Sequence, residues 1–243
     1  KDLFLPENKK MQSLLPKISG LIITYNEEKN IKEVLECFDF CDEIIVVDSF
    51  STDNTVSIAQ SFSKVKVVQN KFEDFAKQRN LALQYAINDW VLFLDADERI
   101  TPNLKAEIIN TLNAPNPKDA YYFKRLFFFA GKPIHFSGTQ GDKNFRLFRK
   151  SKCYYIPERK VHETLSVKGT IGVLKHKLLH YSLSDYHSYC KKVVLYGRLR
   201  GEEMYLKGKR YSALKMYAKM AFQFFKIYIL RGGILDGKEG FLL

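Results

Sequence analysis

The most constraining feature of this 243-residue sequence is the alternation of short apolar segments with helical patterns in its first 110 residues. Each apolar segment is rich in Ile, Val, Leu or Phe and ends in a polar or acidic turn. These segments are residues 18–25, 43–48, 64–69 and 90–94. Apolar runs of this length predict buried strands. Because the strands alternate with helices, the sequence predicts an α/β domain around a mainly parallel sheet with flanking helices.

Acidic and polar side chains occur where these strands end. Residues 24–28 follow the first strand, Asp48 ends the second, and Asp95 and Asp97 follow the fourth. In open parallel sheets the ligand binds at the carboxyl ends of the strands, so we expect these side chains to share one edge. Mg²⁺ and Mn²⁺ prefer carboxylate oxygens and complete their shell with phosphate oxygens and water. The Asp95-x-Asp97 pair therefore predicts a divalent-cation site for a nucleotide substrate, although such loop acids are commonly just solvated.

Two further residues near this edge have both a binding and a structural interpretation. Asp48 is placed either to accept a hydrogen bond from a base N–H or to serve as a turn residue. Arg79, on the helix before the fourth strand, is placed to reach a phosphate or to lie on the surface. The sequence has no Gly-x-Gly-x-x-Gly after the first strand, no P-loop motif and no Gly-x-Ser-x-Gly motif. Dinucleotide-binding and P-loop proteins are therefore disfavoured.

The charge is divided unevenly along the chain. Residues 1–120 contain 14 Lys and Arg and 19 Asp and Glu, a net charge of −5, whereas residues 121–243 contain 25 and 8, a net charge of +17. This asymmetry points to a polyanionic partner (nucleic acid, an anionic membrane or a phosphorylated substrate) or to a merely soluble basic surface. The four cysteines form no Cys-x-x-Cys pair, which disfavours a structural zinc site and fits a reducing compartment.

Beyond residue 120 the chain has aromatic strand patterns, and beyond His180 it has a helical pattern to about Leu230. Within residues 211–230 three lysines fall within about 40° on a helical wheel, and most other positions are apolar or aromatic. They are Lys215, Lys219 and Lys226. A narrow basic stripe on an apolar helix is typical of a helix lying in a membrane interface. The alternative is a terminal helix that packs on the domain or on a partner subunit.

Four motifs follow one another in the first half of the chain. They are residues 21–28 (Leu-Ile-Ile-Thr-Tyr-Asn-Glu-Glu), 45–55 (Ile-Val-Val-Asp-Ser-Phe-Ser-Thr-Asp-Asn-Thr), 77–80 (Lys-Gln-Arg-Asn) and 92–98 (Leu-Phe-Leu-Asp-Ala-Asp-Glu). In this order and spacing they resemble the motifs of family 2 glycosyltransferases of the GT-A fold. The resemblance implies a Rossmann-like, mainly parallel sheet with flanking helices, to which this chain adds a helical C-terminal extension.

Within that family the chain looks most like the bacterial lipopolysaccharide-core glucosyltransferase group. This likeness rests on Phe-Arg-Leu-Phe-Arg at 145–149, Val-His-Glu at 161–163, and Tyr228, Arg231-Gly232-Gly233, Asp236-Gly237 and Gly240-Phe241 near the end of the sequence. The resemblance implies a catalytic domain over residues 1–180, with a nucleotide-sugar-binding part at 18–110 and an acceptor-side part at 120–180. A basic, amphipathic helical region follows at 181–243.

The resemblance also implies a role for each matching residue. The roles are Thr24, Tyr25 and Glu27 in the nucleotide pocket, Asp48 at the uracil, Arg79 at the nucleotide, and Asp95 and Asp97 at the donor ribose or sugar and at a metal, Mg²⁺ or Mn²⁺. Of the two aspartates, Asp97 is the expected direct metal ligand. The sequence departs from the family pattern in Asp48-Ser49-Phe50-Ser51, where Asp-Asp-Gly-Ser is frequent. We therefore expect the pocket beside the base to differ.

The general base is expected in the second half, which has eight acidic residues. Glu163 matches the position where the subgroup would place it; Asp142 is an alternative, and a structural ion pair is another role for Glu163. His162 is a candidate for the metal shell or for proton transfer, and equally for a packed loop histidine. We also place Arg146 and Arg149 on one face of the strand at 145–149, as candidates to contact acceptor phosphates or the donor diphosphate.

Together these expectations describe an inverting glycosyltransferase that moves glucose from UDP-glucose onto an anionic, lipid-linked saccharide such as the lipopolysaccharide core. We expect a peripheral position on the cytoplasmic face of the inner membrane and no nucleic-acid partner, and we leave a homo-oligomer open. One alternative is a nucleotidyltransferase of similar fold, which commonly has a Gly-rich first loop that this chain lacks. Another is a basic nucleic-acid-binding module, which leaves the strand-end acids unexplained.

Overall fold

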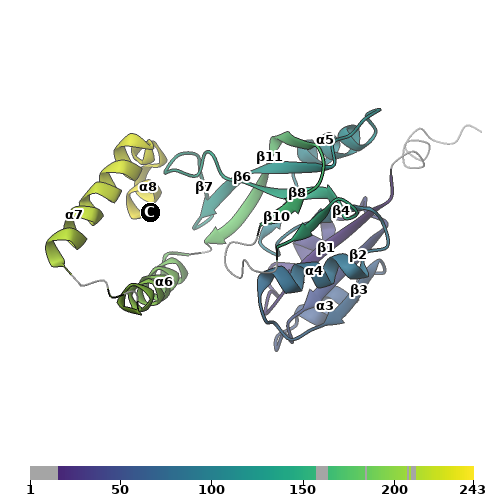
Figure 1. Cartoon of the computed structure of the whole chain (residues 1–243), viewed down its shortest axis with the longest axis horizontal. Helices are drawn as coiled ribbons and strands as arrows, with labels where there is room; N and C mark the ends of the chain where they lie inside the picture. Colours follow the sequence, from purple (N-terminus) through teal and green to yellow (C-terminus); the bar gives the residue numbers. More distant parts are fainter. Residues whose placement is uncertain (1–15, 157–163, 184, 207, 209–211) are drawn as a thin grey trace, which may run out of the picture. The chain divides into compact units, whose positions relative to one another are not determined.

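The structure is a computed structural model of the chain and describes residues 16–156, 164–183, 185–206, 208 and 212–243 (Figure 1). The chain divides into two compact units. The first contains residues 1–124 and 143–178, and the second contains residues 125–142 and 179–243. The four motifs of the first half therefore all lie in the first unit.

The first unit is built on four parallel strands. They are β1 (Ile18–Thr24), β2 (Glu43–Asp48), β3 (Val65–Gln69) and β4 (Trp90–Phe93), and they lie side by side in the order β3-β2-β1-β4. The register places Thr24 opposite Asp48 and Leu21 opposite Phe93. Because all four strands run in the same direction, their carboxyl ends share one edge of the sheet. The parallel sheet predicted from the apolar segments is confirmed in this part of the molecule.

Helices follow these strands as the alternation predicts. They are α2 (Ile31–Glu36), α3 (Thr55–Gln60), α4 (Phe75–Tyr85) and, after β4, α5 (Pro102–Leu112). Two of them begin with a side-chain cap. Asp74 accepts a hydrogen bond from the Lys77 N–H (2.8 Å) at the start of α4, and Thr101 accepts one from the Leu104 N–H (3.2 Å) at the start of α5. These caps satisfy N–H groups that the helices leave without a partner.

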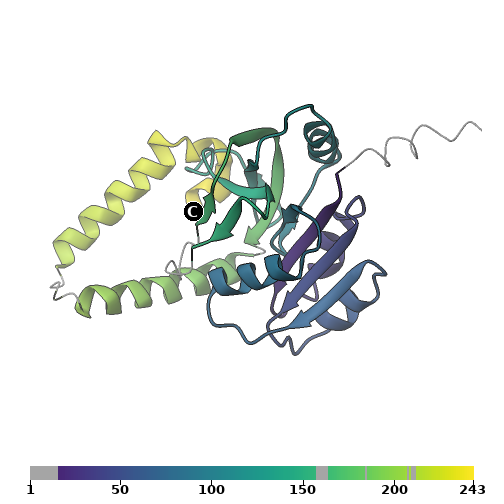
Figure 2. The same ribbon diagram turned by 45° about the vertical axis from the view of Figure 1, so that its right-hand side comes forward.

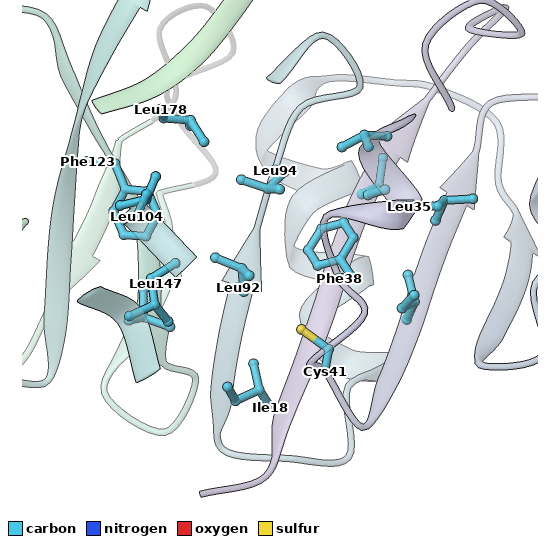
Figure 3. Close-up of a cluster of buried hydrophobic side chains, with 14 of the residues drawn as sticks. Ile18, Leu35, Phe38, Cys41, Leu92, Leu94, Leu104, Phe123, Leu147 and Leu178 are labelled. Carbon is cyan, nitrogen blue, oxygen red and sulfur yellow. The ribbon is translucent and has the colours of Figure 1, made fainter. Parts of the chain in front are cut away.

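The core lies on both faces of the sheet, because the strands are apolar at successive positions. Figure 3 shows the cluster that includes Leu35, Phe38, Leu92 and Leu104. Phe38 is fully buried, and a Cβ atom built at Gly20 of β1 would lie 2.6 Å from its ring. Glycine at this position is therefore what allows the ring to approach the strand so closely.

The sheet continues past β4 with strands of mixed direction. β8 (Lys143–Arg149) pairs antiparallel with β4, β6 (Ala120–Phe129) pairs antiparallel with β8, and β11 (Ile171–Leu183) and β5 (Glu98–Arg99) follow. A separate antiparallel pair is formed by β9 (Cys153–Tyr155) and β10 (Leu165–Val167). β11 extends beyond His180, so the helical pattern expected from that residue begins only at Tyr186.

The second unit holds a hairpin and the C-terminal helices. β7 (Lys132–Ile134) pairs with the end of β6 through a turn at Ala130 and Gly131, both with positive φ. The helices are α6 (Tyr186–Leu206), α7 (Ala213–Phe224), a π-helical segment η1 (Phe225–Leu230), a short 3₁₀ segment η2 (Gly233–Asp236) and α8 (Gly237–Leu242). Figure 2 shows α6 in green and α7 in yellow. This confirms the predicted helical C-terminal region, and no helix within the described residues is long and apolar enough to cross a membrane.

Candidate active site

Two loops at the carboxyl edge of the parallel strands are joined by hydrogen bonds. One follows β1 at residues 24–28, and the other follows β2 at residues 49–55. The bonds run from Asn26 N–H to Ser51 Oγ (2.8 Å), Thr52 N–H to Asn26 Oδ1 (2.8 Å), Glu27 N–H to Thr55 Oγ1 (2.8 Å) and Glu28 N–H to Asp53 Oδ2 (3.1 Å). These hydrogen bonds hold the two loops together, so the residues that follow β1 and β2 are fixed relative to each other.

Thr24 and Tyr25 begin the first of these loops and differ sharply in exposure. Thr24 is buried, and its Oγ1 atom has no hydrogen-bond partner among the described residues. The Tyr25 side chain is 58% exposed. The carboxylate of Glu27 accepts a hydrogen bond from the Asn30 side-chain amide (2.7 Å). A buried polar group without a partner is costly, so Thr24 Oγ1 is a candidate to form a hydrogen bond with a ligand.

Asp48 is fully buried at the end of β2. Its carboxylate accepts hydrogen bonds from the Ser51 N–H (2.9 Å), the Ser51 hydroxyl (2.5 Å) and the Gln69 side-chain amide (3.4 Å). These contacts are those of the turn residue that the sequence offered as one interpretation. A carboxylate has about four lone-pair sites, so it retains capacity for one further donor. Recognition of uracil by Asp48 stays a prediction.

Asp95 lies between two buried arginines. Its Oδ1 atom is 2.6 Å from Arg79 Nη2, and its Oδ2 atom accepts a hydrogen bond from Arg146 Nη2. The same Arg146 nitrogen is 2.7 Å from Oε1 of Glu98, which is fully buried, and Glu98 Oε2 accepts the Asp95 N–H (3.1 Å). Burial lowers the pKa of the Arg146 guanidinium, but Asp95 and Glu98 oppose it and hold the pKa above its ordinary value. Two positive and two negative groups therefore compensate each other in the interior.

The Arg79 and Arg146 side chains are thus tied to Asp95 rather than placed on the surface. The Arg79 guanidinium also lies over the rings of Phe93 (4.7 Å) and Tyr155 (5.5 Å). Glu98 was missed by the sequence reasoning, although it directly follows the Asp-x-Asp motif. No local sequence signal singles out Glu98, because the burial of the two arginines that it and Asp95 compensate is seen only in the structure.

Asp97 is half-buried, two residues beyond Asp95. Both carboxylate oxygens of Asp95 contact arginines. No group of three or more metal-ligating side chains occurs in the part of the chain that the structure describes. One or two carboxylates fit Mg²⁺ or Mn²⁺, since these ions take their remaining ligands from substrate phosphates and water. Metal binding by Asp97 and Asp95 therefore stays a prediction.

The placement of Arg146 and Arg149 on one face of a strand was wrong. The two residues are three positions apart, a spacing that regular alternation does not place on one face. The pairing with β6 also skips Arg146, so the alternation is interrupted there. Arg149 pairs with Trp90 at the amino end of β4, because β8 runs antiparallel to that strand. It contacts Asp89 (3.3 Å) and Asp119 (3.8 Å) and lies over the Trp90 ring (4.4 Å). It is therefore at the edge opposite to Asp95, away from the strand ends that would hold a donor diphosphate.

The candidates for the general base are not assembled by the described residues. Glu163 and His162 lie outside the described residues. Asp142 belongs to the second unit, where its carboxylate pairs with the Arg125 guanidinium. The structure therefore brings together Thr24, Asp48, Arg79, Asp95, Asp97 and Arg146 at or near one edge of a single unit, and it leaves the base as a prediction from the sequence.

Comparison with known proteins agrees with this architecture. The family described as "Glycosyl transferase family 2" matches residues 19–162. An uncharacterized glycosyltransferase of Rickettsia conorii is 30% identical over 244 residues, covering 95% of this chain and 86% of the relative. The lipopolysaccharide core biosynthesis glycosyltransferase LpsC of Rhizobium meliloti is 27% identical over 236 residues, covering 94% of this chain and 87% of LpsC.

A solved structure shares the fold. It is S. aureus TarS in complex with UDP-GlcNAc, which matches with a TM-score of 0.50 and 24% identity over 68% of this chain and 58% of the TarS chain, so that less than two thirds of that protein is covered. The predicted family and fold are therefore confirmed. Because the family matches more than half of the residues of this chain, the chain belongs to glycosyl transferase family 2 and is a glycosyltransferase.

Proposed function

We propose that this glycosyltransferase moves glucose from UDP-glucose onto an anionic, lipid-linked saccharide of the lipopolysaccharide-core class, with inversion at the sugar carbon and a requirement for Mg²⁺ or Mn²⁺. The observation that carries the proposal is the half-buried Asp97 carboxylate beside the compensated Asp95 cluster. The braced loops at residues 24–28 and 49–55 lie at the same edge of the parallel strands. An acidic edge of this kind suits a nucleoside diphosphate that arrives with its metal.

The donor would be held by residues at this edge. Asp48 would accept a base N–H with its remaining lone-pair capacity, and Thr24 Oγ1 would gain the partner that it lacks among the described residues. Tyr25 and Glu27 would line the same pocket. Arg79 would leave or share its contact with Asp95 to approach the diphosphate. When bound at Asp97, the cation would neutralise charge on the departing diphosphate.

Glu163 would act as the general base. It would accept the proton of the acceptor hydroxyl while that oxygen attacks the sugar carbon on the face opposite the diphosphate, which inverts the configuration. Glu163 lies in the Val-His-Glu motif, so His162 is its direct neighbour and a candidate to orient it. The acidic character of the acceptor is supported by the net charge of +17 over residues 121–243 and by the similarity to LpsC, a lipopolysaccharide core biosynthesis glycosyltransferase.

We further propose that α7 and η1 bind the surface of an anionic membrane. None of the twelve residues of α7 is buried, and its exposed side chains include Leu214, Tyr217, Met220 and Phe222. Exposed apolar and aromatic side chains beside the three-lysine stripe at 215, 219 and 226 suit the interface between headgroups and acyl chains. Liposome flotation tests this: the protein should bind anionic vesicles, and charge-neutral substitution of the three lysines should weaken binding. Equal flotation of the triple variant would contradict the proposal.

The decisive experiment for the reaction is product analysis. With UDP-glucose, Mn²⁺ and a lipopolysaccharide-core acceptor, the enzyme should release UDP and transfer glucose, and a chelator should stop both. A panel of UDP-galactose, UDP-N-acetylglucosamine and ADP-heptose identifies the donor by rate. A separate assay with UTP and glucose 1-phosphate tests the alternative, because a nucleotidyltransferase would release pyrophosphate from UTP and would transfer no glucose from UDP-glucose to the acceptor.

A further inference from the structure

Phe50 is held in a backbone conformation that bulky residues rarely adopt. Its φ is +61°, in the left-handed region that favours glycine. Three hydrogen bonds fix the residues on either side of it. The Ser49 N–H donates to the Thr24 carbonyl (2.9 Å), the Gln78 side-chain amide donates to Ser49 Oγ (3.1 Å), and the Ser51 N–H donates to Asp48 (2.9 Å). The surrounding structure therefore imposes this conformation on Phe50.

Folding gives no reason for an aromatic side chain at this position. The Phe50 side chain is 53% exposed, and it packs against no other aromatic ring within the described residues. An exposed ring contributes little burial, and glycine would adopt the same backbone without strain. A strained, exposed aromatic residue that the fold does not require is a candidate for ligand contact.

The position of Phe50 indicates the ligand. It lies two residues beyond Asp48, whose β-strand partner is Thr24. The orphaned Oγ1 of Thr24 is an independent sign of a polar ligand at this edge, since the atom is buried without a partner among the described residues. An aromatic ring beside hydrogen-bonding groups is how proteins hold a nucleobase, because the base has both an apolar face and a polar edge.

We propose that the Phe50 ring is a stacking surface for the base of the nucleotide-sugar donor, and that it contributes to the affinity for the nucleotide. The inference rests on the proposed function, which brings a nucleoside diphosphate to this edge. It adds one contact to the proposed function. Where glycine is frequent at this point of the motif, this chain has a side chain that is able to touch the base.

The test is the binding of UDP in the presence of Mn²⁺, measured by calorimetry on the full chain. Phe50→Gly should weaken UDP binding about tenfold, which corresponds to about 1.4 kcal/mol. Phe50→Trp should retain the affinity, because it restores a ring. The melting temperature of Phe50→Gly should not fall, because glycine relieves the positive φ. Tyr85→Ala is the matched control: this ring is 38% exposed and ends α4, the helix leading to the amino end of β4, so UDP binding should not change.

Inorganic pyrophosphate with Mn²⁺ separates stacking from damage to the loop, because it has no base. Its binding should be equal in the wild-type protein and in Phe50→Gly. Unchanged UDP affinity in Phe50→Gly, or an equal loss for UDP and pyrophosphate, would overturn the stacking role. Failure of the wild-type protein to bind UDP would instead overturn the proposed function on which the inference rests.

Discussion

A single nitrogen, Nη2 of Arg146, donates to the carboxylates of both Asp95 and Glu98. Arg146→Met removes the positive charge of this side chain. The negative charges of Asp95 and of the fully buried Glu98 are then less well compensated. We expect the free energy of unfolding to fall by about 3 kcal/mol, because unpairing a buried ion is strongly destabilising. Urea unfolding followed by circular dichroism measures this change.

Arg149→Met is the matched control on the same strand. Arg149 keeps 31% of its side chain exposed and makes longer contacts with Asp89 (3.3 Å) and Asp119 (3.8 Å). Its loss should cost about 1 kcal/mol or less, since partly exposed ion pairs contribute little. Equal losses for the two variants would contradict the special role assigned to the buried cluster.

The parallel half of the fold could be predicted because each strand carries its own signal. β2 and β4 are apolar runs bounded by polar turns, and Asp48 and Asp95 mark their carboxyl ends. The partners of Asp95 could not be predicted in the same way, because Arg146 lies on an antiparallel strand that is 51 residues away. Its pairing depends on which strand adds to β4, and no local pattern determines that order.

Gly20 and Phe38 give a direct test of the close contact between β1 and the chain after α2. Gly20→Ala should lower the free energy of unfolding by about 2 kcal/mol, because the new Cβ atom would lie 2.6 Å from the Phe38 ring. Phe38→Leu should reduce this penalty, so that the double variant is more stable than the sum of the single changes predicts. Gly141→Ala is the control: nothing lies within 4 Å of its added Cβ atom, so its effect should be about 0.5 kcal/mol or less. Additive losses for Gly20 and Phe38 would contradict the contact.

Asp119 makes the stability depend on pH in the acidic range. Its carboxylate accepts hydrogen bonds from the Thr170 N–H (2.7 Å) and hydroxyl (2.9 Å), and the backbone hydrogen bond is the main cause that lowers its pKa from the ordinary value of 3.8. A lowered pKa in the folded state adds stability above the unfolded pKa, and this stability is lost as the pH falls through the folded value. Asp119→Asn should therefore be less stable than wild type at pH 7. The difference should shrink below about pH 4. Urea titrations from pH 7 to pH 2.5 measure it, and a constant difference would contradict this linkage.

Two acidic residues separate cation binding from proton transfer. Asp97→Asn should weaken Mn²⁺-dependent UDP binding, since it removes a carboxylate ligand. Glu163→Gln should leave UDP binding and the melting temperature unchanged but lower kcat about a hundredfold or more, as loss of a general base does. Glu158→Gln is a control from the same stretch of sequence and should retain activity. Full turnover by Glu163→Gln would exclude it as the base and leave Asp142 as the next candidate.

Asp236 fixes the segment after β7 within the second unit. Its carboxylate accepts hydrogen bonds from the His135 N–H (2.9 Å), the Phe136 N–H (3.0 Å) and the Ser137 hydroxyl (2.7 Å). Ser137 and Gly138 both have positive φ, so this segment depends on such contacts to keep its conformation. Asp236→Ala should cost about 2 kcal/mol, because it removes a charged acceptor from two N–H groups at once.

Hydrogen exchange locates the effect of this substitution. The amides of His135 and Phe136 should exchange at least about tenfold faster in Asp236→Ala, whereas the amides of β1 and β2 should not change. Glu239→Gln is the control, because Glu239 contacts only the exposed end of Lys132 (2.8 Å) among its described ion pairs. Since glutamine keeps the size of the side chain and the partner Lys132 is 66% exposed, the exchange of His135 and Phe136 should match that of the wild-type protein. Unchanged exchange at His135 and Phe136 in Asp236→Ala would show that other contacts hold the segment.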